Sequence, residues 1–76
     1  MNKWTPCKRR IFIQKLKKLG FKDPEMGGRH EYMLYGSYKQ TIPNNKEYSV
    51  PQLRKLINQI EQKIKRKIIL EEWQDL

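Results

Sequence analysis

The sequence contains only one cysteine and one histidine among its 76 residues. Cys7 has no partner for an internal disulfide, and a lone thiol is typical of a reducing compartment. The chain has neither a CxxC spacing nor a Cys/His cluster, so it offers no metal motif, and we expect neither a metal nor another cofactor. We expect Cys7 to be a semi-exposed residue near the start of a helix.

Long apolar runs are also missing. No stretch approaches the roughly 18 residues that a membrane-spanning helix needs, so we expect no membrane partner. The first residues lack the apolar segment of a signal peptide. The expected location is therefore the cytoplasm, and the short chain is expected to form one domain, residues 1–76.

Acidic residues are missing from the first 22 positions, which hold eight lysines and arginines. The formal net charge of the whole chain is +9. A field this positive attracts polyanions and speeds their encounter with the protein. RNA, DNA, an anionic membrane surface and an acidic protein all fit this charge, which does not choose among them.

Apolar periodicity predicts two helices. The first extends over about residues 6–19, where Thr5-Pro6 provides the N-cap and first-turn proline, and Gly20 ends it in a left-handed conformation. The second runs from about residue 50 to at least 66, with Ser49 and Gln52 forming a capping box. Its apolar stripe consists of Leu53, Leu56, Ile57, Ile60, Ile64 and Ile68.

The residues between the helices predict a small antiparallel sheet. Residues 29–37 are rich in β formers, Gly36-Ser37 suits a hairpin turn, and residues 38–43 form the returning strand. A short strand precedes them. The expected fold class is therefore α+β, ordered helix, three-stranded antiparallel sheet, helix (α-β-β-β-α), which resembles a double-stranded-RNA-binding domain.

Residues 69–76 do not continue the stripe of the second helix. Ile69, Trp73 and Leu76 would lie on the opposite side of a straight helix. Either the helix bends or ends near Lys67, or this segment is an extra tail that contacts another chain.

His30 is the candidate catalytic residue. It opens a predicted strand directly after Gly28 and Arg29, so the sheet would hold its ring while the glycine turn leaves it accessible. An imidazole can act as an acid or a base near neutral pH. It could take the proton of a ribose 2′-hydroxyl or protonate the leaving 5′-oxygen of RNA without a metal, while nearby cations stabilise charge on the phosphate.

Three ordered motifs resemble the HicA toxins of bacterial type II toxin–antitoxin systems: "LKKLGF" at residues 16–21, "GGRHEYML" at 27–34, and "TIPNNKEYSVPQLRKLI" at 41–57. The resemblance covers roughly residues 8–60. It implies a fold like that of the double-stranded-RNA-binding domain and an mRNA interferase, an endoribonuclease that acts in stress responses. It also implies His30 as the catalytic residue, Gly28 in the turn that presents it, and a HicB-like antitoxin that masks the site.

The chain departs from the HicA pattern at two positions. Arg29 replaces the serine before the histidine, and Asn45 stands where the family has the histidine of a Pro-x-His loop, with one residue deleted just after it. Arg29 adds a cation that can bind phosphate. Asn45 is thus a second-site residue without acid–base chemistry.

Basic and aromatic residues supply a predicted RNA interface. The candidates for binding phosphate are Lys8, Arg10, Lys17, Lys18 and Arg29. The candidates for stacking on bases are Tyr32, Tyr35 and Tyr38, and at least one of these tyrosines should instead pack in the core.

The expected partners are mRNA and a HicB-like antitoxin, and the protein is expected to form a homodimer or a hetero-oligomer with the antitoxin. A non-catalytic RNA-binding module, a protein-interaction fragment and a membrane-surface helix at residues 50–67 are the alternatives.

Overall fold

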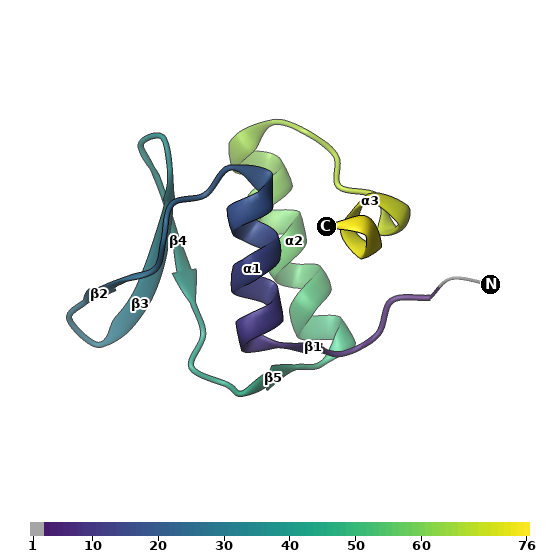
Figure 1. Ribbon diagram of the computed structural model, residues 1–76, viewed down its shortest axis with the longest axis horizontal. Helices are drawn as coiled ribbons and strands as arrows, with labels where there is room; N and C mark the ends of the chain where they lie inside the picture. The colour runs from purple at the N-terminus through teal and green to yellow at the C-terminus, as the bar shows by residue number, and fades with distance from the viewer. Residues whose placement is uncertain (1–2) are drawn as a thin grey trace.

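The computed structural model describes residues 3–76 and shows a small sheet covered on one side by helices (Figure 1). The elements follow in the order β1 (Cys7–Lys8), α1 (Arg9–Leu19), β2 (Glu25–Gly27), β3 (His30–Tyr35), β4 (Tyr38–Ile42), β5 (Glu47–Tyr48), α2 (Val50–Ile64) and α3 (Leu70–Asp75). The fold class is α+β, as predicted, with a three-stranded antiparallel sheet and flanking helices.

The first helix begins at Arg9, so the predicted start at residue 6 is wrong. Residues 7 and 8 instead form β1, in which Cys7 pairs with Tyr48 and Lys8 with Glu47. Lys8 becomes the N-cap residue, with no side-chain cap, in place of Thr5. Cys7 is buried rather than semi-exposed, because this pairing turns it into the core.

The predicted end of the first helix is confirmed. Gly20 adopts a φ of 116°, and the N–H groups of Gly20 and Phe21 donate to the carbonyl oxygens of Lys17 and Leu16. These two bonds define a Schellman motif, which closes the helix and returns Phe21 to the core.

The sheet has the strand order β2-β3-β4, and two short turns set its register. Tyr35 pairs with Tyr38 across the predicted Gly36-Ser37 turn, and Gly27 pairs with His30 across Gly28-Arg29. Gly36 and Gly28 have φ values of 59° and 74°. Glycine accepts this conformation without steric cost at the first turn position, as two-residue hairpins require.

The second helix has the predicted start but ends at Ile64, not at residue 66 or later. Ser49 accepts a hydrogen bond from the Gln52 N–H at 3.3 Å, as predicted, but the Gln52 side chain donates to Asn45 instead of closing a capping box. Lys65 ends the helix with a left-handed φ of 57°. Ile68 therefore lies outside the helix, yet it is buried, and its N–H donates to the Glu61 carboxylate.

One core joins the two long helices, the sheet and α3. Its fully buried residues are Phe12, Leu16, Met33, Ile42, Tyr48, Leu53 and Ile60. α1 and α2 lie side by side on one side of the sheet, and α3 lies against them on the side away from it (Figure 1). Within residues 3–76, no helix has both the length and the apolar character required to cross a membrane.

The C-terminal segment folds back onto the same core. Trp73 of α3 is only 4% exposed, and its ring lies 5.7 Å from that of Phe12. Leu76 also packs against the core, whereas Ile69 is 58% exposed. The three apolar residues of the tail therefore do not form one free strip, because the chain turns between α2 and α3.

Candidate functional site

His30 is the first residue of β3, and its side chain is exposed. Its neighbour Glu31 forms an ion pair with Arg9 of α1, and Met33 is fully buried. Successive side chains of a strand point to opposite faces. His30 therefore points to the face of the sheet away from the helices. We call this the outer face; it carries His30, Tyr32 and Leu34 of β3, Lys39 and Thr41 of β4, and Glu25 and Gly27 of β2.

The turn before His30 has the geometry that the sequence predicts. Gly28 has a φ of 74°, and a side chain added there would meet no atom within 4 Å. Only backbone conformation therefore demands glycine at this position. Arg29, the second turn residue, is exposed beside His30. The turn thus places an imidazole and a guanidinium at consecutive, exposed positions.

Tyr32 and Lys39 share the outer face with His30, and no sequence motif identifies them as a pair. Tyr32 lies two residues after His30, and the Lys39 Nζ atom is 4.3 Å from the centre of the Tyr32 ring. In the register, Lys39 pairs with Leu34 and thus lies diagonally from Tyr32. The alternation of side chains along a strand is enough to predict that Tyr32 and Tyr35 lie on opposite faces of the sheet. The contact between Tyr32 and Lys39 cannot be predicted in this way, because it depends on the register of the hairpin.

The opposite face of β3 is fixed to the start of α1. Arg9 contacts the Glu31 carboxylate, and its Nε donates to the Pro43 carbonyl oxygen at 3.1 Å. Ile42 pairs with Glu31, so Pro43 follows directly beside His30. The strand end that carries His30 is thereby held to both α1 and the loop after β4.

A basic cleft lies at this end of α1. We call it the α1 cleft; it is lined by Lys8, Arg9, Arg10, Lys46 and Glu47. Lys8 and Arg10 belong to the predicted phosphate-binding set, and both are exposed. Lys46 was not predicted. It reaches the cleft because its carbonyl oxygen accepts the Arg9 N–H at 2.9 Å, a contact between distant parts of the chain.

Lys17 and Lys18 lie at the other end of α1. The rise of a helix places Lys17 about 10 Å from Arg10 along the axis. Lys17 also forms an ion pair of 2.7 Å with Asp23. The structure therefore divides the five predicted phosphate-binding residues among the His30 turn, the α1 cleft and the C-terminal end of α1.

Asn45 lies in the loop between β4 and β5. Its side-chain oxygen accepts a hydrogen bond of 3.2 Å from Gln52 Nε2. This contact joins the loop to the first turn of α2 and engages the oxygen of Asn45, which stands where a histidine was expected from the HicA pattern.

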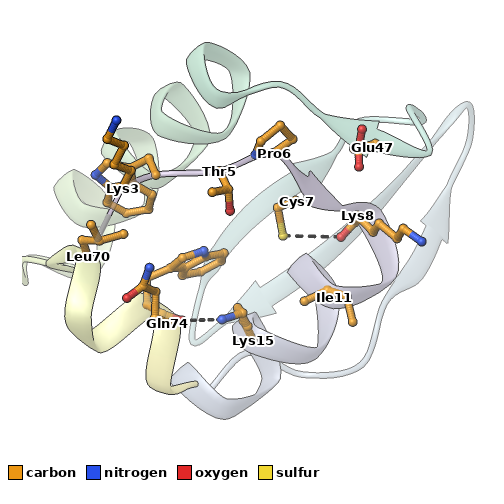
Figure 2. Close-up of a pocket in the computed structure, with 12 residues that line it drawn as sticks. Lys3, Thr5, Pro6, Cys7, Lys8, Ile11, Lys15, Glu47, Leu70 and Gln74 are labelled. Carbon is orange, nitrogen blue, oxygen red and sulfur yellow. Dashed lines mark hydrogen bonds between the residues drawn. The ribbon is translucent and has the colours of Figure 1, made fainter. Parts of the chain in front are cut away.

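A second concavity lies between the N-terminal segment and α3 (Figure 2). Two of the groups that line it have partners: Lys15 Nζ donates to the Trp73 carbonyl oxygen, and Cys7 Sγ lies 3.5 Å from the Lys8 carbonyl oxygen. Burial raises the pKa of the Cys7 thiol, which keeps it protonated near neutral pH. The Lys15 hydrogen bond fixes α3 to α1, and the protonated Cys7 thiol is not a reactive nucleophile.

Metal ligands do not gather in the part of the chain that the structure describes. Among residues 3–76, no three His, Cys, Asp or Glu side chains lie close enough together to hold a metal ion. The acid–base groups of the outer face are His30 and the exposed carboxyl of Glu25, which pairs with Tyr32, and the cations on or beside this face are Arg29 and Lys39.

No protein-family profile, curated protein or solved structure matches this chain significantly. The likeness to HicA toxins consequently depends on the three motifs quoted above.

Proposed function

We propose that the protein is a HicA-like toxin, a metal-independent endoribonuclease with His30 as its catalytic residue, and that its fold is of the double-stranded-RNA-binding type. The observation that supports this most directly is the exposure of His30 at the β2–β3 turn. A ring packed in the core would have no route to a phosphodiester. This ring is accessible, positioned by a strand and flanked by Arg29.

Cleavage would proceed by internal attack. The ribose 2′-oxygen bonds to the adjacent phosphorus while the bond from phosphorus to the 5′-oxygen breaks. One proton leaves the 2′-hydroxyl and one joins the departing 5′-oxygen. His30 performs one of these transfers and water performs the other, since His30 is the only histidine of the chain. Arg29 stabilises the negative charge that builds on the phosphate.

The α1 cleft would hold the RNA backbone beyond the scissile phosphate. Arg9 connects this cleft to Glu31, the residue next to His30. Lys8, Arg10 and Lys46 add three further cations around it. In this proposal an acidic HicB-like antitoxin in the cytoplasm covers the end of the sheet that carries His30 and blocks access to this residue.

A non-catalytic RNA-binding module of the same fold is the second candidate. One observation favours it: the residue in place of the second family histidine is Asn45, whose side-chain oxygen is bonded to Gln52. This arrangement supplies contacts for RNA but no second acid–base group.

The test compares wild type with His30→Ala on a long mRNA in EDTA, with both proteins purified identically. The nuclease proposal expects cleavage by wild type and a loss of about 10²-fold or more in the variant, the size of a general acid–base contribution. Free imidazole added to His30→Ala should restore part of the activity, because the site is open to solvent. Cleavage that persists in the variant reveals a contaminating nuclease. RNA retention without cleavage by either protein supports the binding module.

A further inference from the structure

The four tyrosines of the chain occupy different environments, and only one shares a face with His30. Tyr35 and Tyr38 lie 5.2 and 6.3 Å from the ring of Phe21, on the core side of the sheet. Tyr48 is fully buried. Tyr32 alone projects from the outer face, where it is half-buried and two residues from His30.

The Tyr32 ring leans over the backbone of Gly27, the residue that pairs with His30. A Cβ atom added to Gly27 would lie 2.6 Å from Tyr32 Cε1, which is closer than real Cβ contacts come. The ring can occupy this place only because residue 27 has no side chain. Gly27 has no left-handed φ, so the requirement for glycine here comes from the ring and not from the backbone.

We propose that Tyr32 is a stacking platform for one base next to the phosphodiester at His30, and that it directs the site to single-stranded RNA. This inference rests on the nuclease or RNA-binding function proposed above. Aromatic side chains stack with unpaired bases of any identity, whereas the bases of a duplex are covered by their neighbours. A platform beside His30 therefore selects strands that can present a free base.

Lys39 has a defined part in this arrangement. Its ammonium lies over the Tyr32 ring, and Lys39 is exposed. An exposed cation–π contact is weaker than the stacking of a base on an aromatic ring. The incoming base therefore displaces the flexible lysine, whose ammonium then pairs with a phosphate of the bound strand.

The binding test uses full-length protein carrying His30→Ala, so that cleavage does not interfere, and a short single-stranded RNA containing 2-aminopurine. Stacking quenches the fluorescence of this base. Tyr32→Leu should weaken binding by about fivefold to 150-fold, the range of one stacked base, and abolish the quenching. Tyr32→Phe should retain both, and Leu34→Ala on the same face is the matched control, expected to bind like the parent.

Gly27→Ala provides an independent test that leaves Tyr32 in the sequence. Its Cβ must displace the ring from its place over Gly27, so quenching should fall as in Tyr32→Leu. Combining both substitutions should cause no further loss, because each removes the same interaction. Circular dichroism and urea unfolding establish that each variant is folded.

The results separate this inference from the proposed function. Equal affinity and quenching in Tyr32→Leu and its parent, or equal binding of duplex and single strand, would overturn the platform. If quenching depends on Tyr32 but the wild-type protein does not cleave RNA, the stacking platform is supported and the nuclease proposal is rejected. If wild type and Tyr32→Leu cleave RNA at the same rate, the nuclease proposal stands and the platform proposal is rejected.

Discussion

At the scale of single residues, the structure buries groups that titrate in alkaline solution. Desolvation raises the pKa of Cys7 above its ordinary value of 9.0 and that of Tyr48 above 10.0; Arg9 opposes part of the shift at Tyr48. The Tyr48 hydroxyl also donates to the Pro43 carbonyl oxygen at 2.7 Å. Both groups thus hold their protons more tightly in the folded state than in the unfolded chain.

This difference predicts a loss of stability in alkali that depends on Cys7. Its contribution is complete below pH 9.0 and declines as the pH rises through the folded-state value. Cys7→Ala should reduce the free energy of unfolding by about 1 kcal/mol at neutral pH, and the gap to wild type should narrow above pH 9.0. Urea unfolding of both proteins across this range measures the gap, and a gap that widens with pH would contradict the prediction.

Residue-level prediction of the turn before His30 is confirmed, because its signal is local. Gly28 identifies this turn, and His30 follows it as the exposed first residue of β3. Other placements depend on partners elsewhere in the chain. The position of the Tyr32 ring depends on Gly27, and its contact with Lys39 depends on the hairpin register. Lys46 reaches the α1 cleft through the bond that its carbonyl oxygen accepts from the Arg9 N–H. No local pattern specifies these contacts.

At the scale of elements, the same distinction explains the helix boundaries. Ser49 and Gly20 set a start and an end through bonds to residues within one turn, and both were predicted. Thr5 has an equally good capping side chain, but β1 pairs with β5 and moves the start of α1 to Arg9. Long-range strand pairing therefore overrides a local cap at one helix and not at the other.

The short helix α3 should stabilise the domain chiefly through Trp73. This side chain packs on Phe12, and Lys15 both donates to its carbonyl oxygen and lies 5.2 Å from its ring centre. Trp73→Ala should cost about 3–5 kcal/mol, typical of a buried tryptophan. A domain of this size has a total stability of only about 4–11 kcal/mol, so much of the protein should unfold near physiological temperature.

Ile69→Ala is the matched control for this prediction, since Ile69 belongs to the same segment but is 58% exposed. Its effect on the free energy of unfolding should stay within about 0.5 kcal/mol. Urea denaturation followed by tryptophan-independent circular dichroism measures both variants. Equal effects of the two substitutions would show that the segment is held by something other than the Trp73 contact.

At the scale of the whole molecule, the positive charge is divided over a body of 40 × 26 × 17 Å. Ionic screening limits the reach of an exposed charge to about 8 Å at physiological salt. The α1 cleft and the C-terminal end of α1 are separated by more than this, so in the proposed function they would contact an RNA strand as separate sites. Only the α1 cleft is connected to the end of β3 that carries His30, through Arg9 and Glu31.

This division predicts unequal contributions to the salt dependence of RNA binding. Each lost phosphate contact should reduce the slope of log K against log salt by about 0.7 for a single strand. In protein carrying His30→Ala, Arg10→Gln and Lys46→Gln should each produce this reduction. Lys17→Gln should change the slope less, because Lys17 is paired with Asp23, and Lys63→Gln at the end of α2 is the distant control. Titrations between roughly 50 and 200 mM salt give the slopes. Equal reductions in all four variants would mean that RNA responds to the total charge of the molecule and not to the α1 cleft.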